Sequence, residues 1–331
     1  MTNPVLVEAL RGGRIESRHR GAVAVADAHG TIVLELGDVE QPIYPRSAIK
    51  PLQALPLIET GAADRHGFAE AELALACASH GGEASHVAVV ERMLAKIELD
   101  ASALECGAHW PIHQASTQVL LRAGRSPSAI HNNCSGKHAG FLACCRAIQV
   151  DHHGYVSPTH PVQREVKATI ESLAGLSIPD DRCAVDGCSV PTWALPLRSL
   201  AKAFARFGTG QGLAAARAAA AGRLRVACAT NPHLIAGTGR FCTQVMEALG
   251  TRALVKSGAE GLQCAALPEL GLGIALKCDD GAARAAEVMM ACAIGRVMRD
   301  EASRIALSPF MRPELRNWNG TVVGRLHPTH V

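Results

Sequence analysis

The segment Pro45-Arg46-Ser47-Ala48-Ile49-Lys50-Pro51 places a hydroxyl and an amine three residues apart at the expected start of a helix. Because proline has no amide hydrogen and is tolerated only in the first helical turn, Pro51 predicts that a helix begins close to Ser47. Residues i and i+3 share one helical face, so the Ser47 hydroxyl and the Lys50 amine should face the same space. A lysine with a lowered pKa takes the proton from such a hydroxyl, and the segment therefore predicts a nucleophile and its base.

Strands precede this segment and a helical region follows it. Residues 21–26 and 31–36 are apolar runs separated by a short polar turn, which predicts an antiparallel hairpin. The helix that starts near Ser47 should continue through residue 58, with a kink at Pro56 because a proline inside a helix removes a hydrogen bond. The chain is therefore expected to pass directly from a sheet into its helical part.

Helical patterns dominate the middle of the chain, and strand patterns return near its end. We expect further helices over residues 87–97, 114–122, 138–149, 160–174, 191–207, 211–224 and 282–302, and further strands within 251–261, over 271–278 and near 321–325. No internal repeat or low-complexity linker separates them, so we expect one catalytic domain over residues 1–331. Its class is α+β, an antiparallel sheet flanked by helices, with the sheet-containing part over about residues 1–60 and 250–331 and a mostly helical lobe over about 61–249.

Composition and charge exclude several classes of partner. The net charge is +3 with basic residues scattered along the chain, and aromatic residues make up only 3% of it, so we expect no nucleic acid partner. No segment reaches the roughly 18 apolar residues of a membrane span. The first ten residues show no secretory signal, so we expect a cytoplasmic protein. In a reducing compartment the twelve cysteines should be thiols or metal ligands rather than disulfides.

The densest group of reactive side chains is His131-Asn-Asn-Cys-Ser-Gly-Lys-His-Ala-Gly140. Cys134 and Lys137 are three residues apart at an apparent helix start, where a thiol pKa is lowered. A second thiol, Cys188, lies on another glycine-containing loop. Thiolate and imidazole groups are ordinary zinc ligands, and spacing alone would make His138 the third ligand beside the two thiols.

Ser79-His80-Gly81-Gly82 ends an apolar run with polar groups on a glycine turn. Polar side chains at such a place, where backbone approaches a ligand, are typical of a site wall. A helix C-cap in which Ser79 bonds only to backbone explains the same pattern, and the sequence leaves both interpretations open.

Two sets of motifs connect these residues with known families. Ser47-x-x-Lys50 early and Lys256-Ser257-Gly258 late match the layout of serine β-lactamases and penicillin-binding proteins, although their S-D-N triplet is absent. The full set of motifs, from about residue 6 to 325, resembles the rhizobial-type, class 3 L-asparaginases. These motifs are Pro45-Arg-Ser-Ala-x-Lys50, Leu73-Ala-Leu-Ala-Cys-Ala-Ser-His80, Leu104-Glu-Cys-Gly107, the decapeptide His131–Gly140, His160-Pro-Val-Gln163 and Asp186-Gly-Cys-Ser-Val-Pro191.

The resemblance implies an amidohydrolase that converts L-asparagine to L-aspartate and ammonia through two serine–lysine pairs. It implies Ser47 as nucleophile with Lys50 as its base, and Ser79 with Lys256 as a second pair that relays the proton. It also implies a zinc ion bound through Cys134, Lys137 and Cys188, and a homodimer of serine β-lactamase-like protomers.

Four further residues are candidates for substrate binding. Arg46, beside the nucleophile, is a candidate partner for the substrate α-carboxylate, and its alternative is an ordinary surface arginine. Asp186, next to a zinc-binding thiol, is placed to orient Lys137 or the substrate amine. His80 and His138 neighbour the serine–lysine and thiol groups, and either ring is equally explained as a satisfied hydrogen-bonding group.

Three alternatives remain open at this point. The first is another serine amidohydrolase or a β-lactam-type acyl hydrolase, which S-x-x-K and K-S-G favour. The second is a non-catalytic, zinc-dependent binding protein whose serines line a ligand pocket. The third keeps the enzyme but makes Cys134 the nucleophile, with His138 or Lys137 as base.

Overall fold

The structure is a computed structural model that describes residues 2–330 and divides the chain into two compact units. Unit 1 comprises residues 2–48, 194–212 and 255–330, and unit 2 comprises residues 49–193 and 213–254. The sequence assigned 194–212 to the helical lobe, whereas the structure assigns it to unit 1. The reason is that its helix, α9, covers strands of the unit 1 sheet.

Unit 1 is built on an eight-stranded sheet in which all the paired strands with a determined register are antiparallel. The strand order is β11-β12-β1-β2-β10-β9-β8, with β3 also paired to β2. The strands are β1 (Val5–Arg11), β2 (Arg14–Asp27), β3 (Ile32–Leu36), β8 (Leu254–Ser257), β9 (Leu262–Leu267), β10 (Leu272–Cys278), β11 (Glu314–Arg316) and β12 (Val322–Pro328). A second, two-stranded sheet pairs β4 (Pro42–Ile43) with β7 (Leu195–Pro196).

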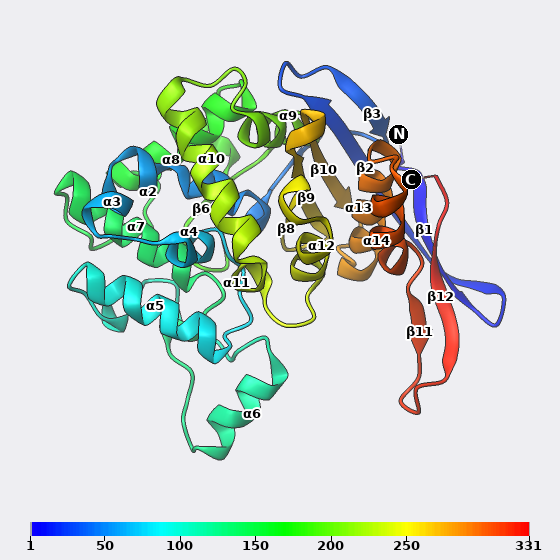
Figure 1. Ribbon diagram of the computed structural model, residues 1–331, viewed down its shortest axis with the longest axis horizontal. Coiled ribbons are helices and arrows are strands. Elements are labelled where there is room, and N and C mark those ends of the chain that lie inside the picture. Colours follow the sequence, from blue (N-terminus) through cyan, green and yellow to red (C-terminus); the bar gives the residue numbers. More distant parts are fainter. Residues whose placement is uncertain (1, 331) are drawn as a thin grey trace. The chain divides into compact units, whose positions relative to one another are not determined.

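Helices cover both faces of this sheet. They are α9 (Leu197–Thr209), α13 (Ala283–Val297) and α14 (Glu301–Met311), and Figure 1 shows α13 and α14 beside the strands. A Cβ at Gly273 of β10 would lie 2.0 Å from the Ala201 carbonyl oxygen of α9, whereas one at Gly21 of β2 would lie 3.3 Å from Met289 Sδ of α13. Because Gly21 pairs with Cys278, five residues from Gly273, the two glycines face opposite sides of the sheet. Residues 21–26 are therefore buried at every position.

Unit 2 is almost entirely helical (Figure 1). Its two short strands, β5 (Cys183–Val185) and β6 (Pro191–Trp193), form a hairpin. Its helices are α1 (Lys50–Gln53), α2 (Leu55–Glu59), α3 (Ala62–Arg65), α4 (Glu70–Ala76), α5 (Ala84–Lys96), α6 (Gln114–Arg122), α7 (Ser135–Ile148), α8 (Pro161–Ala174), α10 (Ala215–Thr230), α11 (Pro232–Ala236) and α12 (Phe241–Leu249).

Close packing of α7 on α4 brings two of the predicted motifs together. A Cβ at Gly136 of α7 would lie 2.4 Å from the Leu75 carbonyl oxygen of α4, so only glycine allows this approach. Cys134 is the N-cap of α7, and Ser79 follows the C-terminus of α4 by three residues. The polar end of one helix therefore lies next to the start of the other.

The fold class is confirmed, and so are several elements. The hairpin of residues 21–26 and 31–36 is part of β2 and β3, and the helix predicted over 114–122 is α6. The helix predicted from Ser47 to residue 58 is wrong in detail, since Arg46–Ile49 form a 3₁₀ turn and α1 and α2 are separated at Ala54. Pro51 and Pro56 each occupy the first turn of their own helix, because a proline fits there and not in a helix interior.

Two other predicted helices are corrected. Residues 191–207 do not form one helix, because the residue before a proline favours extended backbone and both Pro191 and Pro196 follow such residues. Only α9, from Leu197, is helical there. The helix over 282–302 is interrupted because Asp300 caps α14 by accepting a hydrogen bond from the Ser303 amide.

Two further properties concern membrane-spanning helices and cysteines. No helix within residues 2–330 combines the length and the apolar character that crossing a membrane requires. All twelve cysteines are free thiols, and eleven of them are buried.

Candidate active site

In unit 1, Ser47 lies in the 3₁₀ turn Arg46–Ile49, which the Ala48 amide closes by donating to the Pro45 carbonyl oxygen at 3.1 Å. Ser47 is half-buried. The residue before it, Arg46, has a φ of +49°, which is uncommon for a residue with a side chain. Such strain is often retained next to functional groups, and here it immediately precedes the predicted nucleophile.

Lys256 lies on β8, a strand at the edge of the same sheet, and its side chain is 1% exposed. Its Nζ donates to the Ser257 carbonyl oxygen at 2.8 Å. A Cβ at Gly258 would lie 2.9 Å from the Pro45 carbonyl oxygen. The end of β8 is therefore in direct contact with the turn that carries Ser47, and the glycine of Lys256-Ser257-Gly258 is what permits this contact.

In unit 2, Lys50 begins α1 and is fully buried. Its Nζ donates to the Ala78 carbonyl oxygen at 2.5 Å, to Ser79 Oγ at 2.9 Å and to the Asn133 carbonyl oxygen at 3.3 Å. Carbonyl oxygens only accept, so two of the three nitrogen positions are fixed as donors. The remaining contact places the Lys50 amine within hydrogen-bonding distance of the Ser79 hydroxyl.

The two thiols of the predicted zinc site share a hydrogen bond. The bond from Cys188 holds the pKa of Cys134 well below its ordinary value, assisted by the charges of Lys50 and Lys137 and opposed by burial. The same bond, together with burial, raises the pKa of Cys188. The α7 N-terminus also favours a negative charge on Cys134, its N-cap residue. Cys134 is therefore the thiol that ionises first.

Lys137 completes this group. Its Nζ is buried and donates to Cys188 Sγ at 3.1 Å. Burial alone would lower the pKa of Lys137, but Cys188, Cys134 and Asp186 outweigh it and raise that pKa. Asp186 begins the turn between β5 and β6, where its amide donates to the Val190 carbonyl oxygen at 2.8 Å. The β5–β6 hairpin thus delivers both the second thiol and a carboxylate to Lys137.

His138 lies next to this group but is held elsewhere. Its Nδ1 is 2.7 Å from the hydroxyl of Tyr155, and its Nε2 is buried without a hydrogen-bond partner. Burial, followed by the charges of Lys137 and Lys50, lowers its pKa well below the ordinary value. None of the His, Cys, Asp and Glu groups that converge within 4.8 Å among residues 2–330 contains His138 or either thiol. The spacing-based option of His138 as zinc ligand is therefore not supported.

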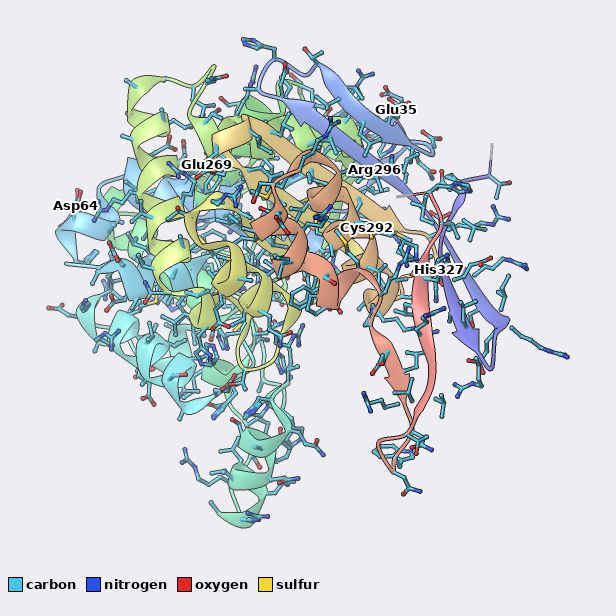
Figure 2. All side chains as sticks on the ribbon, turned by 45° about the vertical axis from the view of Figure 1, so that its right-hand side comes forward. Glu35, Asp64, Glu269, Cys292, Arg296 and His327 are labelled. Carbon is cyan, nitrogen blue, oxygen red and sulfur yellow. The ribbon has the colours of Figure 1, made fainter. Side chains whose placement is uncertain are left out.

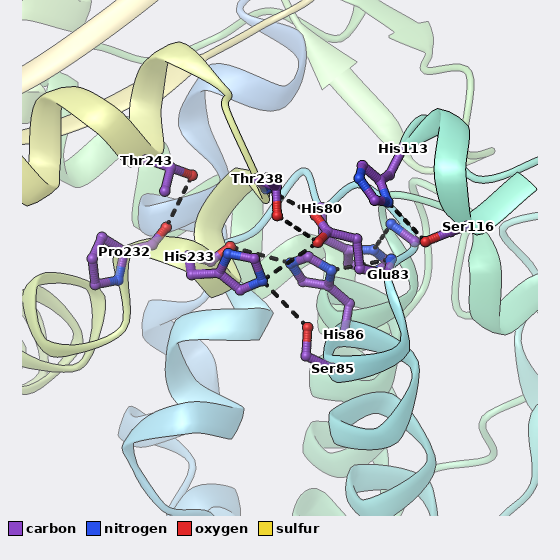
Figure 3. A network of polar contacts seen from close by, with 11 residues as sticks. His80, Glu83, Ser85, His86, His113, Ser116, Pro232, His233, Thr238 and Thr243 are labelled. Atoms are coloured by element: carbon purple, nitrogen blue, oxygen red, sulfur yellow. Dashed lines mark hydrogen bonds and ion pairs between the residues drawn. The ribbon is translucent and has the colours of Figure 1, made fainter.

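His80 connects the Ser79 segment to a wider polar network (Figure 3). The Gly82 amide donates to His80 Nδ1 at 3.1 Å, which leaves a proton on Nε2 for Ser135 Oγ at 2.9 Å. The His80 ring stacks on His86 at a centroid distance of 5.0 Å, and His86 stacks on His233 at 5.1 Å. His80 is fully buried, and burial lowers its pKa well below the ordinary value.

A carboxylate fixes the other side of this network. Glu83 accepts from the amide of Thr238 at 2.8 Å and from its hydroxyl at 2.7 Å, as Figure 3 shows. The Ser79 amide donates to the Ile235 carbonyl oxygen at 2.9 Å. The segment that follows α10 therefore holds the backbone on which Ser79 is mounted.

The structure arranges the predicted residues in two groups. Unit 1 holds three of them: Arg46 and Ser47 on one turn, and Lys256 on β8, whose end contacts that turn. Unit 2 holds the other eight, which are Lys50, Ser79, His80, Cys134, Lys137, His138, Asp186 and Cys188. The contact between Lys50 and Ser79 was not predicted, because the sequence paired each with a different partner. The backbone acceptors of Lys50 and the Tyr155 hydroxyl were also missed. Asn133 lies within the quoted decapeptide, whereas nothing in the sequence distinguishes Tyr155.

Comparison with known proteins completes the description. No curated protein sequence matches the chain. Among solved structures it is similar to Mglu in its native form, at 16% identity over 86% of this chain and 65% of that chain, with a TM-score of 0.45. It is also similar to a putative β-lactamase from Bacteroides dorei DSM 17855, at 10% identity, 85% and 93% coverage and a TM-score of 0.44. A β-lactamase from Mycobacterium bovis gives 13% identity, 88% and 95% coverage and a TM-score of 0.37. The family model of L-asparaginase II matches residues 7–328, so the chain belongs to the L-asparaginase II family.

Proposed function

We propose that the protein hydrolyses L-asparagine to L-aspartate and ammonia by serine–lysine catalysis. Membership of the L-asparaginase II family supports the reaction class. The observation that carries the proposal is the fully buried Lys50 amine, which two carbonyl oxygens orient toward the Ser79 hydroxyl. A lysine held in this way inside a protein is suited to proton transfer, and the neighbouring Cys134 is a group whose charge interacts with it.

In the proposed mechanism Ser47 Oγ attacks the side-chain amide carbon of the substrate, and its proton passes to Lys50. The tetrahedral intermediate collapses when its C–N bond breaks, and the leaving nitrogen takes a proton from the serine–lysine groups and departs as ammonia. A water molecule then attacks the acyl ester, gives up a proton to the same groups and releases L-aspartate and the Ser47 hydroxyl. Ser79, bonded to Lys50, forms with Lys256 the second pair that relays the proton.

Zinc fits the donors that the structure brings together. Cys134 and Cys188 share a hydrogen bond and are ordinary zinc ligands as thiolates. Lys137 Nζ lies 3.1 Å from Cys188 Sγ, close to the roughly 3.5 Å that separates nitrogen and sulfur ligands in a tetrahedral site. We propose that these three residues would hold the ion. When bound, zinc supplies a fixed positive charge that orients the substrate beside the serine–lysine groups.

The remaining predicted residues receive supporting roles. Arg46, on the turn of the nucleophile, is proposed to bind the substrate α-carboxylate. Asp186 is proposed to orient Lys137 or the substrate amine, since its charge acts on Lys137. His80 and His138 make their hydrogen bonds within the protein, so we propose that they fix the walls of the site through Ser135 and Tyr155.

The proposal extends to the setting of the enzyme. A homodimer is proposed from the resemblance to class 3 L-asparaginases. A cytoplasmic location is proposed from the twelve free thiols, which a reducing compartment would preserve.

Ammonia release from L-asparagine by the purified protein is the direct test. Ser47→Ala should lower kcat by at least about 10⁴-fold while leaving the melting temperature within about 2 °C, because it removes the attacking atom and little packing. Ser17→Ala, at a half-buried serine of β2 in the same unit, is the matched control and should keep full activity.

The alternatives give different outcomes in the same assay. Full activity in Ser47→Ala together with loss in Cys134→Ser would transfer the nucleophile to the thiol. Penicillin hydrolysis without asparagine hydrolysis would favour the β-lactam-type enzyme. Tight binding of asparagine without ammonia release would favour the non-catalytic binding protein.

A further inference from the structure

A cavity of about 750 Å³ lies in unit 1, away from the residues assigned to catalysis. Side chains of α13 and α14, the segment that follows α14, and Pro328 at the end of β12 line it. Its volume is within the range of roughly 300–1,000 Å³ that small-molecule sites occupy. The cavity is therefore large enough for a ligand rather than for water alone.

Three arginines line this cavity: Arg296 of α13, Arg304 of α14 and Arg312 just beyond it. Among the described residues, none of the three guanidinium groups makes a hydrogen bond or an ion pair, and no Asp or Glu lines the cavity. Several other arginines of unit 1 are paired: Arg11 with Glu16, Arg18 with Glu8 and Arg316 with Glu314. The cavity thus gathers positive charge that the protein itself does not neutralise.

The charge of these arginines reaches the interior of the cavity. Cys292 lies one helical turn before Arg296 on α13, as Figure 2 shows, and its buried thiol lines the cavity. Burial raises the pKa of Cys292 to about 11, and the charges of Arg312 and Arg296 act against this rise. Two arginines on different segments therefore act on the same point, as they would on the head group of a bound anion.

The remaining wall is largely apolar. Ile305, Pro309 and Met311 contribute hydrocarbon and thioether surface, and the Ser308 hydroxyl is the polar group next to them. Ile305 is 66% exposed, so it adds apolar surface to this wall that the chain itself leaves uncovered. A simple inorganic ion would leave this apolar surface unused.

We propose that this cavity binds an organic anion in which a carboxylate or phosphate group is joined to a short apolar body. The guanidinium groups match the planar, bidentate geometry of carboxylate and phosphate oxygens. The apolar wall receives the body of the ligand and removes it from water. This site is independent of the proposed asparagine chemistry and uses none of its residues.

Isothermal titration calorimetry of the full-length protein tests the proposal with four probes: hexanoate, hexyl phosphate, inorganic phosphate and 1-hexanol. At least one of the two amphipathic anions should bind one per chain and at least about tenfold more tightly than inorganic phosphate or hexanol. The tighter of the two identifies the head group. Arg304→Ala should weaken that binding by about tenfold or more, because a charge-assisted hydrogen bond is lost. Ile305→Ser should weaken the binding of the amphipathic anion and leave the binding of inorganic phosphate unchanged.

Arg299→Ala is the matched control, since Arg299 is an exposed arginine between α13 and α14 that does not line the cavity. Equal weakening by Arg299→Ala and Arg304→Ala would overturn the proposal in favour of general surface charge. It would also be overturned if neither amphipathic anion bound at concentrations of about 10 mM. Asparaginase activity should be unaffected by Arg304→Ala, so the result does not depend on the proposed function.

Discussion

The two units differ in how many polar or charged side chains they bury. Among the described residues, the buried polar or charged side chains of unit 1 are His19, Lys256, Gln263 and Ser303, and all the others belong to unit 2. Burying such groups costs free energy unless each finds partners. Unit 2 therefore bears this cost at more positions than unit 1, and ionisable groups buried in this way are the ones whose pKa values shift most.

The contrast is sharpest between the two buried lysines. Lys50 of unit 2 is held by carbonyl oxygens from two separate segments, at Ala78 and Asn133, and by Ser79. Lys256 of unit 1 donates to the carbonyl oxygen of the next residue in its own strand. Removing Lys50 would therefore leave backbone acceptors of two separate segments without their donor.

After that of Ser47→Ala, the largest expected effect is the one of replacing either buried lysine. Lys50→Met and Lys256→Met should each lower kcat/KM by about 10²–10⁴-fold, the range for loss of a general acid or base. Lys50→Met should also destabilise the protein by about 2 kcal/mol or more, because it leaves two buried carbonyl oxygens without a donor. Steady-state kinetics and thermal unfolding of both variants measure this. A Lys50→Met variant that keeps more than a tenth of wild-type activity would exclude Lys50 as the base.

The fold could be predicted where the local pattern and the tertiary packing agree. The hairpin at residues 21–36 and the helix over 114–122 follow from periodicity and turn residues. Strand β9 was not separately predicted because all six of its residues, from Leu262 to Leu267, are buried, which removes the alternation that marks a strand. Residues Gly21–Ala26 are small, so the sequence pattern likewise does not show that helices cover both faces of β2.

The site could be predicted in its residue types but not in its pairing. Sequence motifs identify Lys50, Ser79 and the two thiols as reactive groups. They do not show that Lys50 reaches Ser79, because that contact joins the start of α1 to the segment after α4, 29 residues away. Backbone acceptors such as the Ala78 carbonyl oxygen carry no side-chain signal at all. Long-range pairing and backbone contacts are thus what tertiary structure adds.

A smaller effect is expected from the thiols. Cys134→Ala and Cys188→Ala should each lose zinc and raise KM by about 10–100-fold, with a smaller change in kcat, because the metal is proposed to position substrate. Elemental analysis and kinetics on the same samples measure both quantities. Cys264→Ala, at a buried thiol of unit 1, is the control and should keep both metal and KM.

The outcomes separate the possible roles of zinc. Retention of zinc by both thiol variants would show that the ligands are misassigned. Loss of zinc with no turnover at saturating asparagine would give the metal a part in the chemical step. Loss of zinc with unchanged KM would make it structural.

The smallest expected effect is a loss of stability at acid pH, and we expect it in unit 2 rather than in unit 1. Burial holds the pKa values of His80, His86 and His138 below their ordinary values. Below about pH 6.5 the unfolded chain binds protons that the folded unit 2 does not, so the free energy of unfolding falls as pH falls. Each such group contributes up to about 1.4 kcal/mol per pH unit below 6.5, until the pH reaches its folded pKa.

Hydrogen exchange at pH 7.5 and pH 5.5, corrected for intrinsic rates, should therefore show amides of unit 2 losing protection before those of the unit 1 sheet. His80→Asn is the informative variant, because asparagine retains an acceptor for the Gly82 amide but does not titrate in this range. It should reduce the acid-induced loss of protection in unit 2 and leave the exchange of β2 and β10 unchanged. His29→Asn, at an exposed turn of unit 1, should change neither unit. Two outcomes would contradict this prediction: equal acid sensitivity of both units, or no difference between His80→Asn and the parent protein. Either would show that the buried histidines do not set the pH dependence of stability. Another group, such as a carboxylate of the ion pairs, would then set it.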